Sequence, residues 1–190
     1  MIQKKAKKVE IPEGIIDFKE YEKLLSHIHN SALWYATNYP RNSGYLKEKL
    51  YDKGYPRESS QYKDLDGSIK EVNFVEEAVN KMIDISMIDD ETYAESLFEL
   101  LVEKGKSLSV IRFELRQKYV DPLTIETLLE NFDNDEKIIE SIDKSAQKIL
   151  RSSTYKKQDT DMKKNQKLIQ GLMSKGFNYS EIELWKNSQE

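Results

Sequence analysis

The sequence contains no cysteine, so it can form neither a disulfide framework nor a thiolate metal site. Its only histidines, His27 and His29, are two positions apart and would point in different directions on a helix, which disfavours a shared metal ion. It also lacks a Walker-type glycine loop, a G-x-S-x-G motif and a histidine near a nucleophile. These absences predict a protein that is not an enzyme and that has no metal ion or cofactor.

The chain of 190 residues also lacks an apolar run close to the length of a membrane span. Its first residues, Met1–Lys5, lack the apolar stretch of a signal peptide. The composition is 38% hydrophobic and 34% charged, which is typical of a soluble chain with an ordered core. We therefore expect a cytoplasmic monomer that does not contact a membrane.

The charges are segregated along the chain, although the net charge is only −4. Seven acidic residues lie between Asp84 and Glu103 without one lysine or arginine among them. Between Lys144 and Lys167, eight basic residues outnumber two aspartates. Such a chain can present a basic face to an acidic partner despite its acidic total.

A short pattern occurs three times, and it is the main sign of how the chain is organised. An apolar pair four residues apart is followed by a lysine, a helix-ending position and a large apolar residue. The copies are Leu46, Leu50, Lys53, Gly54 and Tyr55; Ile111, Leu115, Lys118, Tyr119 and Val120; and Leu168, Leu172, Lys175, Gly176 and Phe177. Repetition on this scale predicts stacked supersecondary units.

Each repeat is predicted to contain a lead helix, a middle helix with the pattern, and a closing helix. We expect lead helices at about 18–39, 90–104 and 136–151, middle helices at about 43–53, 109–118 and 162–175, and closing helices at about 75–85, 122–131 and 180–188. The predicted fold is an all-α tandem array, elongated and curved, of three three-helix repeats (18–86, 87–133 and 134–190). A flexible basic arm, residues 1–17 with Lys4, Lys5, Lys7 and Lys8, precedes it.

Capping residues support these boundaries. Asp121-Pro122 places an N-cap aspartate before a proline at the first helical position. Asn178 with Glu181 has the spacing of a capping box. We expect the other helices to be capped by Ser43, by Asp89, and by Ser107 or Ser109. The acidic run Asp89–Glu91 is explained by this capping and by the helix dipole rather than by a metal site.

One segment departs from the helical pattern. Asp66-Gly67 lies between short runs that contain tyrosine, isoleucine and valine, which predicts a small β-hairpin within 61–74. The hairpin belongs to an insertion in the first repeat, at about 56–74. An isolated hairpin is marginally stable in water, so we expect it to pack on a helix or on a partner.

Basic residues lie beside the apolar stripe of each middle helix, at roughly corresponding positions. Repeated cations suit a repeating acidic partner, such as a nucleic-acid backbone or a protein filament, although an ordinary solvated helix surface also accounts for them. A helix-turn-helix reader of bases is disfavoured, because Leu123, Thr124 and Glu126 stand where base-contacting residues would be needed. The contact candidates are Arg41, Lys47, Lys49, Arg112, Arg116, Lys118, Lys164 and Lys167.

Three stretches together resemble the RecX family, regulators of the recombinase RecA. They are Ala32–Ala36 with Arg41-Asn42-Ser43, Ile88–Ala94 with Glu114–Lys118, and Leu172 with Lys175–Phe177 and Ile182. The residues of the structural repeat motif are Leu46, Leu50, Gly54, Tyr55, Asp89, Asp90, Tyr93, Ala94, Leu115, Leu172, Gly176 and Phe177. The family usually has an acidic residue where Tyr45 stands, glycine where Tyr119 stands, and no insertion at 56–74. Because a non-glycine residue in a left-handed cap is strained, we expect the turn at Tyr119 to differ.

The resemblance implies a curved array of three-helix repeats that binds along the groove of the RecA–DNA filament and limits its growth and activity. The implied partners are the RecA filament and single- or double-stranded DNA, and no catalytic residue is implied. Two other hypotheses remain open from the residues themselves. The chain could be a DNA-binding helical module that acts without RecA, or a helical scaffold whose hairpin is the docking edge for another protein.

Overall fold

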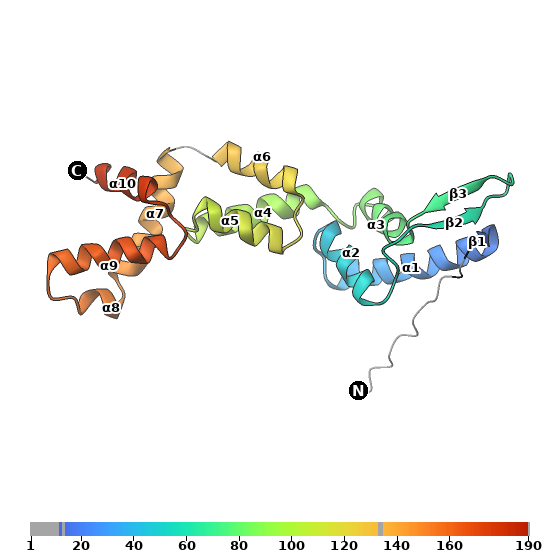
Figure 1. Cartoon of the computed structure of the whole chain (residues 1–190), viewed down its shortest axis with the longest axis horizontal. Coiled ribbons are helices and arrows are strands. Elements are labelled where there is room, and N and C mark those ends of the chain that lie inside the picture. The colour runs from blue at the N-terminus through green and yellow to red at the C-terminus, as the bar shows by residue number, and fades with distance from the viewer. Residues whose placement is uncertain (1–11, 13, 133–134, 190) are drawn as a thin grey trace, which may run out of the picture. The chain divides into compact units, whose positions relative to one another are not determined.

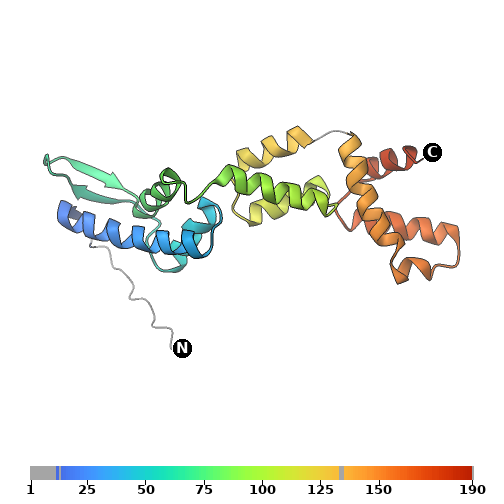
Figure 2. The ribbon, with the colours of Figure 1, turned by 180° about the vertical axis from the view of Figure 1, so that it is seen from behind.

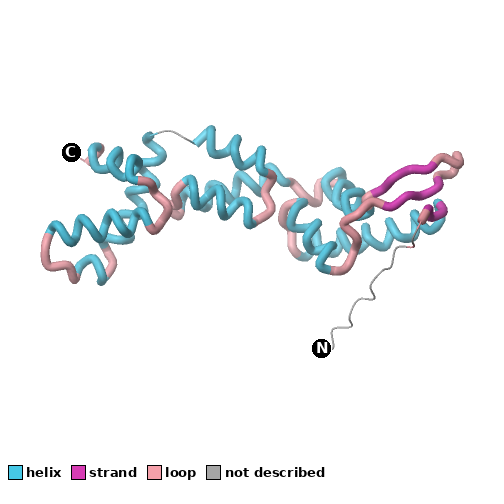
Figure 3. Tube along the Cα trace, viewed as in Figure 1, coloured by secondary structure: helices cyan, strands magenta, loops and turns pink. Residues whose placement is uncertain are grey.

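The computed structural model describes residues 12, 14–132 and 135–189, so the lysines of the predicted basic arm lie outside the described residues. The described part contains ten helices and three short strands (Figures 1 and 3). The chain divides into two compact units, residues 1–90 and 91–190. The elements are β1 (Ile15–Asp17), α1 (Phe18–Asn38), α2 (Ser43–Asp52), β2 (Ser60–Lys63), β3 (Ile69–Val72), α3 (Phe74–Asp84), α4 (Asp90–Glu103), α5 (Leu108–Gln117), α6 (Pro122–Phe132), α7 (Asp135–Leu150), α8 (Ser153–Lys156), α9 (Asp161–Met173) and α10 (Tyr179–Asn187).

The fold is all-α apart from the small sheet, with three helices around each of three hydrophobic cores. Each of the nine predicted helices is present with bounds within two residues of those expected. The four-residue helix α8 was not predicted, because a single turn has no apolar periodicity. It is stabilised locally by Ser152, whose hydroxyl oxygen accepts a hydrogen bond from the Tyr155 N–H at 3.3 Å.

Three other predicted caps form, and one is corrected. Asp121 accepts hydrogen bonds from the first turn of α6, Ser107 caps α5, and Asn178 forms the capping box of α10 with Glu181. The cap of α2 is Asn42 rather than Ser43. The Asn42 side-chain oxygen accepts a hydrogen bond from Tyr45 N–H at 3.1 Å, because an amide oxygen is as good an N-cap acceptor as a hydroxyl.

The repeated pattern ends each middle helix in the same way. At the end of α2, Tyr55 N–H donates to the Leu50 carbonyl at 3.3 Å, and Gly54 N–H donates to the Tyr51 carbonyl at 2.9 Å. These two bonds define a Schellman motif, which also brings the large apolar residue back toward the last leucine. The same pair of bonds recurs at Val120 to Leu115 and Tyr119 to Arg116, and at Phe177 to Leu172 and Gly176 to Met173.

The turn at Tyr119 keeps this geometry, so the expectation that it would differ is wrong. Tyr119 adopts a φ of 61°, in the same left-handed region as Gly54 and Gly176. Its side chain is 48% exposed, so the ring extends into solvent and does not obstruct the turn. A left-handed non-glycine residue costs roughly 1–2 kcal/mol in backbone strain. At Tyr119 the two capping hydrogen bonds offset this strain.

In the N-terminal unit, the predicted hairpin is part of a three-stranded sheet of order β1-β2-β3. Strands β2 and β3 are antiparallel, with Ser60 opposite Val72, and Gly67 lies in the turn between them. Strand β1 pairs in parallel with β2, with Ile16 opposite Tyr62. The end of the segment predicted as a flexible arm is therefore a strand with a buried Ile16, which was too short for its alternation to be recognised.

The sheet packs on α1, as the marginal stability of a lone hairpin led us to expect. The Tyr21 ring stacks on the Tyr62 ring, with 3.9 Å between centroids and 5° between planes. Figures 1 and 2 show the sheet beside α1 from both sides. Burial of Tyr21, with Glu77 the next contributor, raises the pKa of its hydroxyl to about 12. The sheet thus closes one side of the first core, which also includes Phe74 and Val72.

In the C-terminal unit, serine hydroxyls join the second and third cores. Ser145, which is buried, donates to the Gly105 carbonyl at 2.6 Å, and Ser141 donates to the Lys106 carbonyl at 2.9 Å. In the opposite direction along the chain, Ser107 donates to the Lys175 carbonyl at 3.0 Å. Carbonyl groups at helix ends lack partners within their own helix, and these serines satisfy them.

Side chains of the second repeat lie so close to Gly176 that they leave no room for a side chain at this position. A Cβ atom at Gly176 would lie 2.5 Å from Ser107 Oγ and 2.7 Å from Val110 Cγ2. Its φ of 89° also lies in the region that disfavours side chains. Gly67 has a comparable φ of 86° but is uncrowded, because the nearest atom to an added Cβ is Lys63 Cε at 4.0 Å.

We predict that Tyr119→Gly stabilises the C-terminal unit by about 0.5–1 kcal/mol. Relief of left-handed strain exceeds the added conformational freedom of the unfolded chain, and little packing is lost. Urea unfolding followed by the fluorescence of the buried Trp185 measures the change. The matched control is Gln117→Gly, which places glycine inside the end of α5 and should destabilise by about 1 kcal/mol. A Tyr119→Gly protein less stable than wild type would contradict the prediction.

We also predict that Gly176→Ala destabilises the chain far more than Gly67→Ala does. Both changes place a side chain in a left-handed position, at a cost of about 1–2 kcal/mol. Only alanine at 176 also overpacks the junction, which adds about 1–3 kcal/mol. Calorimetric unfolding of the two variants measures the difference. Equal losses at both positions would show that the junction relaxes without cost.

Candidate nucleic-acid interface

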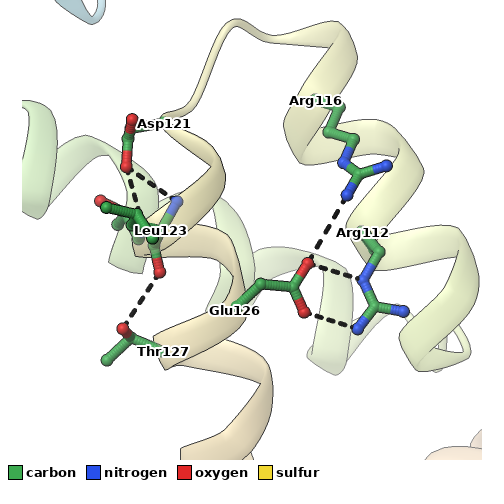
Figure 4. A network of polar contacts seen from close by, with 7 residues as sticks. Arg112, Arg116, Asp121, Leu123, Glu126 and Thr127 are labelled. Carbon is green, nitrogen blue, oxygen red and sulfur yellow. Dashed lines mark hydrogen bonds and ion pairs between the residues drawn. The ribbon is translucent and has the colours of Figure 1, made fainter.

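Two of the predicted contact residues form equivalent ion pairs in the first two repeats. Lys47 and Arg112 each follow the first apolar residue of the repeated pattern. Lys47 Nζ lies 2.6 Å from Glu76 Oε2 on α3, and Arg112 makes two hydrogen bonds to Glu126 on α6, at 3.1 and 2.7 Å (Figure 4). Both therefore join a middle helix to its closing helix, which is a structural role.

The third repeat lacks this ion pair. Ile169 occupies the position equivalent to Arg112, and Glu183 is the counterpart of Glu126. The Tyr179 hydroxyl forms a hydrogen bond with Glu183 instead, and this interaction raises the pKa of Tyr179. The pair is thus replaceable, as expected for exposed ion pairs that typically contribute about 0–1 kcal/mol.

The expectation that the other basic residues occupy corresponding positions is wrong. Lys49 lies three residues after Leu46, whereas Lys164 and Lys167 lie four residues and one residue before Leu168. Five of the eight candidates form ion pairs with carboxylates in the described structure: Lys47 with Glu76, Lys49 with Asp52, Arg112 and Arg116 with Glu126, and Lys164 with Asp161. Arg41 instead lies over the Tyr45 ring, and Lys118 and Lys167 are exposed.

The structure places a different set of lysines around a groove in the C-terminal unit. Two cavities, of about 640 and 240 Å³, share the lining residues Lys148, Ser174 and Lys175. Neither cavity is lined by an aspartate or a glutamate. We call this feature the lysine groove, and its five lysines are Lys104, Lys106, Lys148, Lys167 and Lys175.

The cations of the lysine groove differ in their existing partners. Lys148 Nζ donates to the Lys104 carbonyl at 2.6 Å, and Lys106 Nζ lies 3.1 Å from Glu114 Oε1. In the described part of the chain, the side chains of Lys104, Lys167 and Lys175 have no acidic partner. A groove with several ammonium groups and no carboxylate can hold a phosphate-like anion, particularly an extended one that meets several cations.

Only Lys167 belongs both to the sequence-predicted contacts and to the lysine groove. The other four lysines escaped notice because they come from α7 and from the ends of α4 and α9, which are distant in sequence. The dense basic stretch 144–167 was the available signal, but it did not show which lysines converge.

Within the described ranges there is no cluster of side chains suited to a metal ion, and no helix is long and apolar enough to cross a membrane.

Comparison with known proteins identifies the fold. Residues 89–129 match the second three-helix domain of RecX, and residues 135–185 match the third. The chain is 30% identical over 184 residues to the regulatory protein RecX of Leuconostoc mesenteroides, an alignment that covers 94% of this chain and 64% of that protein. The chain belongs to the RecX family. This confirms the resemblance inferred from the three sequence stretches.

Further relatives agree with the RecX assignment. The regulatory protein RecX of Lactococcus lactis is 36% identical over 107 residues, which cover 56% of this chain and 39% of that protein. The chain thus spans less than two thirds of the length of these curated relatives. The crystal structure of RecX from Lactobacillus salivarius superposes with a TM-score of 0.64 at 26% identity, covering 88% of this chain and 97% of that one. A second RecX crystal structure gives a TM-score of 0.65 at 26% identity, covering 94% of this chain and 79% of that one.

We predict that the carboxyl group of Glu126 titrates below its usual pKa, because Arg112 forms two hydrogen bonds with it and Arg116 adds attraction. A lowered folded-state pKa means that the pair stabilises the fold above the unfolded pKa and that this contribution is lost as pH falls through the folded pKa. Carboxyl-detected NMR titration measures the pKa of Glu126. Arg112→Gln should raise the Glu126 pKa more than Arg116→Gln, since Arg116 makes one contact at 3.6 Å. The reverse order would contradict the assignment.

Proposed function

We propose that this chain is a RecX-type regulator that binds the RecA–DNA filament and limits recombinase activity. The observation that carries the proposal is family membership, since two RecX three-helix domains match and RecX relatives align over most of the chain. The relatives are named regulatory proteins, which favours control of another protein over catalysis. A binding role also suits a surface built from distributed cations.

Within this function, we assign contact with the DNA backbone to the lysine groove. Lys104, Lys167 and Lys175 offer charges that no carboxylate in the described structure neutralises, and Lys148 lies among them. Phosphates along a strand are a repeating acidic partner of the kind that several converging lysines bind. Lys47 and Arg112 would have to leave their glutamates to take part, so they are weaker candidates than the sequence suggested.

A second candidate function is DNA binding without RecA. The observation that favours it is again the lysine groove, because phosphate recognition does not depend on a protein filament. A scaffold role through the hairpin remains a third hypothesis, since β3 lies at one edge of the sheet and can offer backbone hydrogen bonds to an added strand.

The decisive experiment measures the single-strand-dependent ATPase and strand-exchange activities of RecA with substoichiometric amounts of the full chain. We expect both activities to fall, because a regulator bound at a few filament sites blocks growth beyond them. Co-sedimentation with RecA–DNA filaments should accompany the loss. If neither activity changes and the chain stays out of the filament pellet, the RecA function is excluded.

We predict that Lys104→Ala/Lys167→Ala weakens binding to single-stranded DNA and flattens its salt dependence. Loss of two phosphate contacts should reduce the slope of log affinity against log salt by about 1.4. Fluorescence anisotropy with a labelled oligonucleotide measures the slope. The matched control is Lys19→Ala/Lys23→Ala, which removes the same charge from exposed positions on α1. Equal effects of the two double variants would argue against a specific role for the groove.

A further inference from the structure

The C-terminal end of α1 carries three aromatic rings in mutual contact. Trp34 lies 5.0 Å from Tyr35 and 5.8 Å from Tyr39, measured between ring centroids, with edge-on geometry in both pairs. The Tyr35 and Tyr39 rings are 6.5 Å apart. Edge-on contacts of this kind are favourable between aromatic rings, so the three side chains form one continuous apolar surface.

Two of these three rings are exposed, and Tyr35 is partly buried. Trp34 is 53% exposed and Tyr39 is 51% exposed, whereas the other tryptophan of the chain, Trp185, is 7% exposed. The first core is already closed around Ala32 and Ala36 on the buried face of α1. Packing of the fold therefore does not account for the apolar area that Trp34 and Tyr39 leave in solvent.

Cations adjoin the rings within the same unit. The Arg41 guanidinium lies 4.5 Å from the Tyr45 ring centroid, and Lys49 Nζ lies 5.5 Å from the same centroid. A third cation adjoins the three rings directly, because Lys53 Nζ lies 5.9 Å from the Tyr35 ring centroid. We call Trp34, Tyr35, Tyr39, Arg41, Tyr45 and Lys53 the aromatic–cation surface. Lys49 is left out of it because Lys49 is paired with Asp52.

We propose that the aromatic–cation surface binds single-stranded DNA, with bases stacked on Trp34 and Tyr39 and phosphates beside Arg41 and Lys53. Proteins that bind single strands combine exposed aromatic rings, on which any base can stack, with nearby cations that follow the backbone. Lysine is depleted from the cores of protein–protein interfaces, so the position of Lys53 over the Tyr35 ring favours a nucleic acid over a protein partner.

This inference goes beyond the lysine groove, since it adds recognition of bases in the other unit of the chain. The choice of DNA over RNA rests on the proposed action at a RecA–DNA filament. The stacking itself does not depend on RecA, so it can be tested with the full chain and DNA alone. If the chain does not bind DNA through these rings, the proposed effect on RecA is not contradicted. If the chain has no effect on RecA, the proposed stacking of bases is not contradicted.

The experiment titrates the full chain with a thymidine oligomer of roughly 12 nucleotides and follows tryptophan fluorescence. Trp34 is exposed and Trp185 is buried, so stacking should quench the Trp34 emission and leave the Trp185 emission unchanged. Trp34→Ala should weaken affinity by about 5- to 100-fold, while Trp34→Phe should retain most of it. The matched control is Phe113→Ala, which removes an aromatic ring 60% exposed on α5 and should leave affinity unchanged.

Salt dependence separates the two parts of the surface. Arg41→Ala should reduce the slope of log affinity against log salt by about 0.7, whereas Trp34→Ala should lower affinity at every salt concentration with the slope unchanged. Far-ultraviolet circular dichroism confirms that each variant is folded.

Several results would overturn the proposal. They are an absence of quenching at low salt, equal losses for Trp34→Ala and Phe113→Ala, and tighter binding of a uridine oligomer of the same length. A Trp34→Ala chain that loses its effect on RecA but keeps full affinity for the thymidine oligomer would reassign the surface to a protein partner.

Discussion

The fold depends on one recurring need, which is to end a short helix inside a small core without leaving its last carbonyl groups unpaired. The repeated pattern meets this need with a left-handed residue, such as Gly54, followed by a large apolar residue, such as Tyr55. The N–H of the apolar residue pairs with the carbonyl of the last leucine, and its side chain returns to the core. Because these bonds use only backbone groups, they also form when Tyr119 stands in place of glycine. The only energetic cost is the backbone strain of a left-handed residue with a side chain.

Helix ends also explain how the second and third repeats join and why lysines gather there. The carbonyls of Gly105 and Lys106, at the end of α4, accept hydrogen bonds from two serines of α7. Lys148, from the same helix, donates to the Lys104 carbonyl one position earlier. The carbonyl end of a helix carries partial negative charge, which favours nearby cations. The lysine groove therefore has a local electrostatic cause.

Local features were predictable from the sequence because each depends on neighbours within a few residues. The helix bounds, the caps at Asp121 and Asn178, and the turn at Gly67 are of this kind. Features made by residues far apart in sequence were not predictable. The pairing of β1 with β2, the convergence of Lys104 with Lys175, and the neutralisation of Arg112 by Glu126 all require the tertiary structure.

The parallel pairing of β1 with β2 links two segments that the sequence separates. Among the described residues, β1 has β2 as its only strand partner, and β2 lies within the insertion of the first repeat. A chain without the insertion would leave Ile16 without its strand and the Tyr21 ring without Tyr62. The insertion and the residues that lead into α1 therefore behave as one structural module, so in the evolution of this chain neither could be gained or lost alone without exposing part of the first core.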